Sequence, residues 1–340
     1  MIFFVNAPVQ LFHKVMPLIE AKQPERLVVV TVPELAPFFK RHTHAKVIVP
    51  RVDSNLVSMR TKRKLLTNII KSKIEYRRLF SKYRGEEVYF THTSWSVVQF
   101  SYIKKLARYN KVFLYSGKPY MQSGETTYDL YEEEHSIRAW FMRLIAKVFL
   151  GVDVYIKNKG GRPVWELRVD RFPCTVVEGY DAPCFKDVIS GSFIDLDILK
   201  GKSVLFLGSD ITTEGFDEIE VDRLTDRLLV LLNKICPSKY VIKGHPRDGK
   251  LFGGMVGHKD VIDQHIISET LLSHSWDFVL GYYSEALMTA KENTGAVVIS
   301  LLRFLTWPNV TLRDYWVKEY MNVGITIPDT MEELEGLLAC

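Results

Sequence analysis

Three short polar segments in the second half of the chain hold residue types that suit the binding of a phosphate. Each directly follows an apolar run: Gly208-Ser209, Lys243-Gly244-His245-Pro246 and Gly281-Tyr282-Tyr283-Ser284-Glu285. Lysine and histidine side chains donate hydrogen bonds, and a cationic His245 would oppose the charge on a leaving phosphate. Ser284 stands where a helix is predicted to begin, and a helix N-terminus favours anions. Because these segments hold no carboxylate cluster, the predicted chemistry needs no divalent metal.

Each of these features also has an ordinary interpretation. The His245-Pro246 dipeptide is of a kind common in turns, and Ser284 could act only as the N-cap of its helix. The joint placement of the three segments at strand ends of one predicted sheet favours a shared binding site over separate ordinary roles. The residues assigned to this predicted site are Gly208, Ser209, Lys243, His245, Pro246, Tyr283, Ser284 and Glu285.

The elements that must position these segments follow from the alternation of short apolar runs with amphipathic stretches, which is typical of βαβ units. In the first half, strands are expected at residues 2–5, 27–32, 47–49, 88–90 and 112–115, with 152–156 and 175–177 completing the sheet. The pattern restarts near residue 203, with strands expected at 203–207, 240–242, 261–262, 278–280 and 296–299. The predicted fold class is therefore α/β, with two open sheets facing a cleft that the carboxyl ends of their strands line.

The amphipathic stretches between these strands predict helices, at residues 9–20, 96–109, 137–150, 223–235, 269–274, 285–291 and 331–340. Within the helix at 137–150, Trp140, Phe141, Leu144 and Phe149 lie at helical spacing, and we expect them in the core. Residues 116–134 are rich in glycine, tyrosine and acids and are predicted to form a long loop, which in a compact domain is usually functional.

Composition and cysteine usage exclude several classes of protein. The 340 residues are 47% hydrophobic and 25% charged, which is average for a globular chain of two domains. The four cysteines form no CxxC pair, which argues against a zinc site and a disulfide framework. The apolar start of the chain ends at Asn6, and no run reaches the roughly 18–20 apolar residues of a membrane span. We therefore expect a cytoplasmic protein.

Residues 60–84 carry ten lysines and arginines against one acid, Glu75, although the net charge of the chain is only +5. One interpretation is a solvated helix face. The other is contact with an anionic surface, either a negatively charged glycan or the lipid of the inner face of the cell membrane. Nucleic acid is disfavoured as a partner because no nucleic-acid-binding module accompanies the charge.

Four short islands of sequence resemble bacterial sialyltransferases of the lipooligosaccharide and capsular polysialyltransferase type. VIKGHPRD, which contains His245, resembles their His-Pro motif, and GYYSEALM, which contains Ser284, resembles their serine motif. VLFLGSD at residues 204–210 resembles the opening of their nucleotide domain, and FFVNAPVQLF at residues 3–12 their N-terminal strand, turn and helix. The islands follow the family's order over most of the chain. The His-Pro motif also occurs in the glycerophosphotransferases of teichoic acid synthesis.

The resemblance implies a GT-B glycosyltransferase with two Rossmann-like domains: an acceptor-binding domain at residues 1–190 and a nucleotide-sugar-binding domain at 200–330. It implies metal-independent transfer, with inversion and without a cofactor, of a nonulosonic acid such as sialic acid from a CMP-activated donor. The implied acceptor is a glycan of the lipooligosaccharide or capsule type. His245 would protonate or stabilise the departing CMP phosphate, Ser284 would hydrogen-bond it, and the backbone near Gly208 and Ser209 would help to seat the nucleotide.

One departure from the family pattern concerns the general base. The family places an acidic pair before a glycine in the first domain, whereas the candidate positions here, Ser116-Gly117 and Ser123-Gly124, hold no carboxylate. The acceptor hydroxyl still needs a base within hydrogen-bond reach. We assign this role to Glu125 or Asp129, with His92 in reserve. The residues expected to contact the acceptor are Asn6, Gln10, His92, Trp95 and Lys118.

Other functions stay open at this point. The same fold could use CMP-Kdo as its donor, or it could use CDP-glycerol, which is the donor type of teichoic acid synthesis. A non-catalytic glycan-binding or membrane-binding module, in which the basic segment carries the function, is a further alternative. A nicotinamide-dependent oxidoreductase and a P-loop enzyme are disfavoured, because the glycine motif of neither is present.

Overall fold

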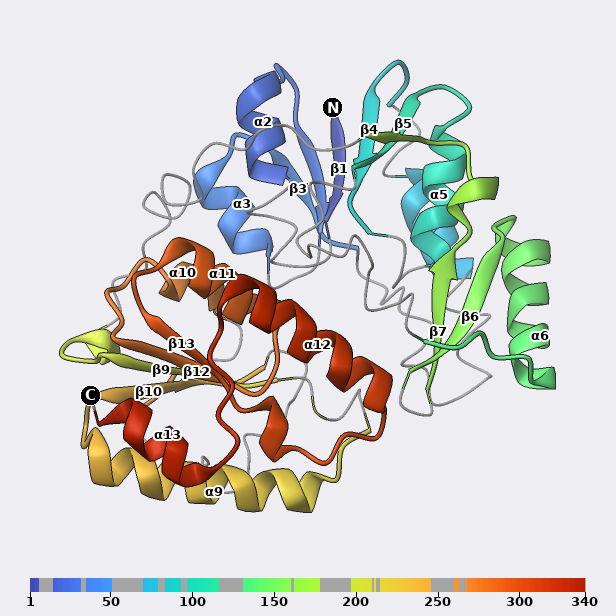
Figure 1. The fold of residues 1–340 in the computed structure, drawn as a ribbon. Coiled ribbons are helices and arrows are strands. Elements are labelled where there is room, and N and C mark those ends of the chain that lie inside the picture. Colours follow the sequence, from blue (N-terminus) through green and yellow to red (C-terminus); the bar gives the residue numbers. More distant parts are fainter. Residues whose placement is uncertain are drawn as a thin grey trace. The chain divides into compact units, whose positions relative to one another are not determined.

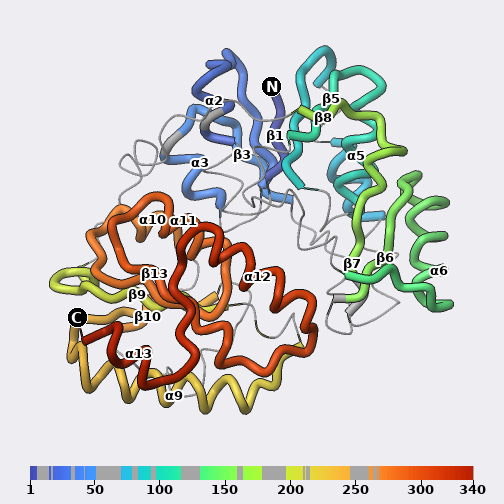
Figure 2. Tube along the Cα trace, viewed as in Figure 1, coloured from blue at the N-terminus to red at the C-terminus, as the bar shows by residue number. Residues whose placement is uncertain are grey.

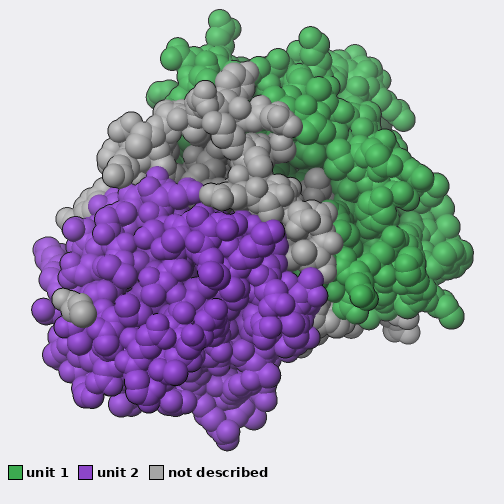
Figure 3. Space-filling view, in the orientation of Figure 1, with its two compact units in different colours: residues 1–120, 124–183 green, residues 121–123, 184–340 purple. Residues whose placement is uncertain are grey.

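The computed structural model describes residues 1–5, 15–31, 35–50, 70–78, 83–92, 97–115, 131–159, 162–177, 197–209, 211, 215–245, 260–262, 266 and 268–339. The chain divides into two compact units, residues 1–120 with 124–183 and residues 121–123 with 184–340 (Figure 3). Each unit is built around one parallel sheet with helices packed on it (Figure 1). The predicted α/β class with two parallel sheets is confirmed.

The sheet of unit 1 has six parallel strands in the order β3-β2-β1-β4-β5-β8. Their bounds are Ile2–Val5 for β1, Val28–Thr31 for β2, Lys46–Ile48 for β3, Glu87–Phe90 for β4, Lys111–Tyr115 for β5 and Thr175–Val177 for β8. All four residues of β1 are fully buried, as its unbroken apolar run predicts for a strand covered on both faces. In the register, Phe3 of β1 is level with Val29 of β2 and Tyr89 of β4.

The helices of unit 1 connect and cover these strands. They are α2 (Met16–Lys22), α3 (Ala36–His42), a helix over residues 70–78, α5 (Val97–Leu106) and α6 (Ile137–Ile145), which continues as the π-helix η3 (Ala146–Leu150). The helix predicted at residues 9–20 is described only from residue 15 and ends two residues later than expected. The sequence analysis missed α3, which starts with a proline in its first turn and spans only seven residues.

The prediction that residues 152–156 join the sheet of unit 1 is wrong. Residues 154–156 lie in β6 (Val154–Lys159), which pairs antiparallel with β7 (Arg162–Leu167) in a separate two-stranded sheet. Two residues separate these strands, and parallel strands need a crossover of a dozen or more residues, so only antiparallel pairing is open to them. The Gly160-Gly161 dipeptide between them is the hairpin signal in the sequence.

The prediction that Trp140, Phe141, Leu144 and Phe149 lie in the core is also wrong. Their exposed fractions are 59%, 54%, 39% and 51%. The opposite side of the helix, with Ala139, Ile145, Ala146 and Leu150, is buried in the core of unit 1. The helical spacing was read correctly, but the packed face is the one with small alanines, which let the helix lie close to β6 and α5.

The sheet of unit 2 has five parallel strands in the order β11-β10-β9-β12-β13. Their bounds are Val204–Leu207 for β9, Tyr240–Lys243 for β10, Val261–Ile262 for β11, Phe278–Gly281 for β12 and Val297–Ser300 for β13. The helices of this unit are α9 (Glu218–Ile235), α10 (Ser268–Leu271), α11 (Glu285–Asn293), α12 (Val310–Val323) and α13 (Met331–Leu338). The sequence analysis missed α12, whereas every strand expected in this half is present.

Both sheets follow the strand order of a Rossmann-like fold. The first strand of each unit lies inside its sheet, the next two strands extend the sheet to one side, and the following strands extend it to the other. In unit 2 the chain runs from β9 outward through β10 to β11 and then returns to β12 and β13. Figure 2 colours the trace by residue number, so the course of this unit can be followed from yellow to red. The order reverses between β9 and β12, and in open α/β sheets ligands bind outside the carboxyl ends of the strands at such a point.

Candidate phosphate site in unit 2

The three predicted segments meet at the carboxyl edge of one sheet. In the register, Leu207 at the end of β9 is level with Lys243 of β10 on one side and Gly281 of β12 on the other. Gly208, Gly244 and Tyr282 therefore follow directly from one row of the sheet. The structure thus brings together segments that lie up to 74 residues apart in the chain.

Two glycines allow this close approach. A Cβ atom on Gly281 would lie 2.9 Å from the carbonyl oxygen of Leu207. A Cβ atom on Gly208 would lie 3.1 Å from the amide nitrogen of His245. The Gly208 amide also donates a 2.8 Å hydrogen bond to the carbonyl oxygen of Lys243. The ends of β9, β10 and β12 are held at distances that side chains at these two positions would prevent.

Ser209 joins the two strands that flank the reversal of strand order. Its hydroxyl donates to the carbonyl oxygen of Tyr283 at 2.6 Å and accepts from the amide of Tyr283 at 3.1 Å. The Ser209 side chain is buried, so it fixes the loop rather than facing a ligand. The Tyr283 ring is buried as well and packs against Phe216, Trp307 and Trp316. In this site, Ser209 and Tyr283 determine the path of the backbone.

Ser284 is the N-cap of α11, as its ordinary interpretation requires. Its Oγ accepts a 3.1 Å hydrogen bond from the amide of Ala286. A serine hydroxyl that accepts one bond still has a proton to donate, so the capping role is compatible with a bond to a phosphate oxygen. Ser284 is partly exposed, and it lies at the positive end of a nine-residue helix.

The sequence analysis missed the residue that holds Ser284 in place. The amide of Ser284 donates to the hydroxyl of Tyr320 at 2.6 Å, and that hydroxyl donates to the carbonyl oxygen of Ser284 at 3.0 Å. Burial raises the pKa of Tyr320 well above its usual range, so its hydroxyl stays neutral. Tyr320 lies on α12, 36 residues away, and no local pattern in the sequence connects it with Ser284.

Lys243 is a buried lysine beside the His-Pro segment. Its Nζ donates a 2.6 Å hydrogen bond to the carbonyl oxygen of Gly244, so the ammonium group supports the turn that leads to His245. His245 itself is partly exposed. Pro246 lies outside the described residues.

Glu269 is a second buried ionisable group near this edge that the sequence analysis missed. Burial raises the pKa of the Glu269 carboxyl to about 7; the charge on Glu285 adds to the rise, and Lys243 opposes it. Glu269 lies on α10, which packs against α11. Glu285, in the first turn of α11, is partly exposed. The site therefore has two groups that are or can become cationic, Lys243 of β10 and His245 of the following turn. It also has two acids, Glu269 on α10 and Glu285 on α11.

In unit 1, His92 is the one predicted acceptor contact within the described residues. It follows β4, is 6% exposed and forms a 3.1 Å hydrogen bond through Nε2 with Oε1 of Gln99 on α5. Its ring also lies 5.8 Å from the ring of Phe100. The other predicted residues of this half lie outside the described part of the chain: Asn6, Gln10, Trp95, Lys118, Glu125 and Asp129.

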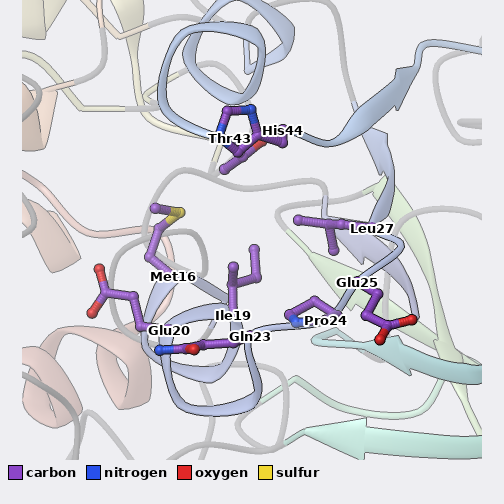
Figure 4. Close-up of a pocket in the computed structure, with 9 residues that line it drawn as sticks. All are labelled: Met16, Ile19, Glu20, Gln23, Pro24, Glu25, Leu27, Thr43 and His44. Atoms are coloured by element: carbon purple, nitrogen blue, oxygen red, sulfur yellow. The ribbon is translucent and has the colours of Figure 1, made fainter.

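A pocket of about 440 Å³ opens in unit 1, between α2 and the segment before β3 (Figure 4). It lies at the amino ends of β2 and β3, where Leu27 and His44 line it, and not at the carboxyl ends where parallel sheets bind ligands. Its acidic lining residues, Glu20 and Glu25, disfavour an anion. This pocket is therefore a weaker candidate than the edge of the sheet in unit 2.

Comparison with known proteins identifies the fold. No protein-family model and no curated protein sequence matches the chain. Arabidopsis thaliana UGT89C1, solved with UDP, is 10% identical with a TM-score of 0.51, over 99% of this chain and 89% of that one. The glycotransferase of kitacinnamycin is also 10% identical over the same shares, with a TM-score of 0.50. The GT-B domain of a sialyltransferase from Photobacterium damselae is 14% identical, with a TM-score of 0.46 over 97% and 98% of the two chains. The chain thus has an α/β fold with two parallel Rossmann-like sheets, as in GT-B glycosyltransferases.

Proposed function

We propose that this chain is a glycosyltransferase that takes a nonulosonic acid from a CMP-activated donor and transfers it to a glycan. The observation that supports it best is the row formed by Lys243, Leu207 and Gly281, from which the His245 and Ser284 segments emerge on either side of β9 in a GT-B fold. The His-Pro and serine motifs of the resembling sialyltransferases lie in these two segments. The fold supports a nucleotide-sugar donor in general, and the motifs favour the CMP-activated class.

In this proposal the donor phosphate lies at the N-terminus of α11. The Ser284 hydroxyl donates to a phosphate oxygen, and the helix dipole stabilises the charge that develops as the glycosidic bond breaks. His245, from the end of β10 on the other side of β9, donates a proton or a hydrogen bond to the departing CMP. Gly208 and Ser209 hold the backbone against which the nucleotide lies. No metal ion takes part in this set of contacts.

The acceptor glycan, of the lipooligosaccharide or capsule type, is assigned to unit 1. Asn6, Gln10, His92, Trp95 and Lys118 are the proposed contacts, and Glu125 or Asp129 the proposed base. His92 follows β4 and forms a hydrogen bond with Gln99, which fixes the position of its ring at the end of that strand. Inversion is implied by the resemblance to the sialyltransferases, and a single displacement at the donor carbon, with one base and one leaving-group partner, would produce it.

Donor choice is tested by incubating the purified protein with CMP-sialic acid, CMP-Kdo, CDP-glycerol and UDP-glucose and measuring nucleotide release with and without glycan acceptors. The proposal expects release of CMP from the nonulosonate donor. Release of nucleotide from CDP-glycerol alone would instead indicate a transferase of the teichoic acid type. Binding of a glycan without release of any nucleotide would make it a non-catalytic module.

A matched pair of histidine variants tests the proposed leaving-group partner. His245→Ala should reduce kcat by about 100-fold or more, the usual contribution of a positioned acid or electrostatic group. His274→Ala removes an imidazole from the same unit, where Nε2 bonds to the carbonyl oxygen of Lys202 before β9, and should keep kcat within about twofold. Equal turnover of the two variants would exclude His245 from catalysis.

A further inference from the structure

The helix formed by α6 and η3 exposes an apolar stripe. Six large apolar side chains of this helix are between 39% and 87% exposed: Ile137, Trp140, Phe141, Leu144, Val148 and Phe149. At 100° per residue, the four that lie in α6, Ile137, Trp140, Phe141 and Leu144, fall within about a third of the helix circumference. Figure 1 shows the helix at the outer edge of unit 1, with the β6–β7 hairpin on its inner side. A contiguous exposed patch of this kind marks an interaction surface.

Positive charge flanks the stripe on both sides. Arg138 lies next to it on one side of the helix, and Arg143 and Lys147 lie next to it on the other, while residues 137–150 contain no acid. Lys147 is exposed and 3.4 Å from Asp153, and Arg143 forms an ion pair with Glu133. These pairs anchor the cations beside the stripe without burying them.

Neighbouring helices add lysines at the C-terminal end of the stripe. Lys104 of α5 donates a 2.5 Å hydrogen bond to the carbonyl oxygen of Gly151, and Lys73 of the 70–78 helix donates to that of Phe149. The 70–78 helix holds four basic residues and one acid, and its Ile70 and Ile74 are 56% and 49% exposed. The cationic border therefore continues beyond the helix itself.

We infer that the α6–η3 face docks the protein onto a lipid bilayer with anionic headgroups. Aromatic side chains such as Trp140 and Phe141 suit the interface between headgroups and acyl chains, and arginine and lysine beside them pair with lipid phosphates. A two-fold contact with a second copy would instead place the cations that border one stripe, Arg138, Arg143 and Lys147, near those that border the other and cost free energy by like-charge repulsion. The charge pattern thus selects lipid over a second copy of this chain.

This inference rests on the apolar stripe of α6 and η3, with residues 70–78 of the basic segment at 60–84 in its cationic border, and it does not rest on the proposed transferase activity. A polybasic segment binds by charge alone, so added salt should release it. The α6–η3 face should bind through both charge and apolar insertion. Binding is measured without nucleotide, so a failure of docking leaves the proposed function untouched.

The experiment is co-sedimentation of the full chain with vesicles of phosphatidylcholine, with or without about one-third phosphatidylglycerol. The wild type should bind the anionic vesicles, and Trp140→Ser/Phe141→Ser should weaken binding at least about tenfold, since both side chains leave the bilayer. The matched control is Ile219→Ser/Val230→Ser, which removes two exposed apolar residues of α9 in unit 2 and should bind as the wild type does.

A spectroscopic measurement keeps the test valid if the serine variant is poorly folded. Brominated lipids should quench the wild-type tryptophan fluorescence, and Trp140→Phe should retain vesicle binding but lose that quenching. Equal quenching in both proteins, or equal binding of wild type and Trp140→Ser/Phe141→Ser, would overturn the inference. Concentration-dependent self-association that the serine variant abolishes, without vesicle binding, would assign the face to a second copy.

Discussion

Ser284 combines a structural and a proposed chemical role in one hydroxyl group. Its oxygen caps α11, its proton is assigned to the donor phosphate, and Tyr320 holds its backbone on both the amide and the carbonyl side. A preorganised donor of this kind needs no rearrangement when charge develops on the phosphate. The position of the hydroxyl is therefore determined by a helix and by a tyrosine from another helix.

Ser284→Ala separates the two roles. It should weaken CMP binding about 10-fold or more, since a hydrogen bond to a charged group contributes about 1.5–3 kcal/mol. It should also lower the free energy of unfolding by about 1 kcal/mol through loss of the cap. Titration calorimetry with CMP and urea unfolding give the two values.

Thr330→Ala is the control for Ser284→Ala, because Thr330 caps α13 in the same unit through a 3.2 Å bond from the amide of Glu333. It should show a similar loss of stability with unchanged CMP affinity. If both variants bind CMP as the wild type does, Ser284 is only a cap.

Glu269 predicts a pH dependence of stability. Its pKa in the folded protein is raised from 4.5 to about 7, so between these values the folded chain keeps a proton that the unfolded chain releases. The buried carboxyl therefore contributes stability that is fully present below pH 4.5 and is lost as the pH rises through about 7. Glu269→Gln removes this loss, so from pH 5 to pH 8 the variant should gain on the wild type by roughly 1–3 kcal/mol. Parallel stability curves from thermal unfolding across this range would contradict it.

At the residue scale, the sequence predicted what lies at strand ends and missed what crosses between elements. His245, Lys243 and Ser284 stand directly after apolar runs, so their places at the sheet edge could be inferred from the chain order alone. The Ser209–Tyr283 bond and the contact of Tyr320 with Ser284 depend on which strands and helices become neighbours. Only the folded sheet defines those neighbours.

At the scale of the elements, β12 and β9 come closer than most side chains allow. Gly281→Ala would place a Cβ atom 2.9 Å from the carbonyl oxygen of Leu207, so the strands must shift. We expect a loss of about 1–3 kcal/mol in the free energy of unfolding, as for other overpacked sites. Gly295→Ala, where no atom lies within 4 Å of the added carbon, should change it by less than about 0.5 kcal/mol. Urea unfolding of the two variants compares them directly, and equal midpoints would mean that the strands absorb the methyl group.

The elements themselves were predictable where hydrophobic periodicity determines them. Buried strands such as β1 and β9 form unbroken apolar runs, and these were found. The β6–β7 pair was assigned to the wrong sheet because periodicity shows that a strand exists but not which strand it pairs with. On α6 the spacing was right and the face was wrong, since Ala139 and Ala146 rather than Trp140 pack inward. Size complementarity at a helix contact is not visible in a hydrophobic pattern.

At the scale of the whole molecule, the chain repeats one parallel architecture in two units, and our proposal places the donor phosphate in the second. Among the helices in the described part of the chain, none has the length and apolar composition of a bilayer span. The sequence pattern identified both sheets, because the apolar runs restart after the middle of the chain. The acceptor residues could not be compared in the same way, since all but His92 lie outside the described residues.

Ligand-dependent hydrogen exchange tests this assignment across both units. CMP at 100 times its Kd should stabilise the folded state to which it binds by about 2.7 kcal/mol. The slowed amides should lie in residues 204–209, 240–245 and 281–287, while the strands of unit 1 at residues 2–5 and 87–90 keep their rates. Slowing confined to unit 1 would mean that CMP binds there and not to unit 2, which would contradict the proposal.

The position of β9 also has a consequence for the order in which unit 2 can form during synthesis. The ribosome completes this strand first, yet its two partners, β10 and β12, follow about 33 and 71 residues later, several seconds apart at about 5–20 residues per second. Until β12 emerges, the nascent β9 has an open side with unpaired amides and carbonyls, and such an edge can pair with another chain. Codon choice or chaperone supply over residues 244–281 should therefore affect the yield of folded protein more than the same change after β13.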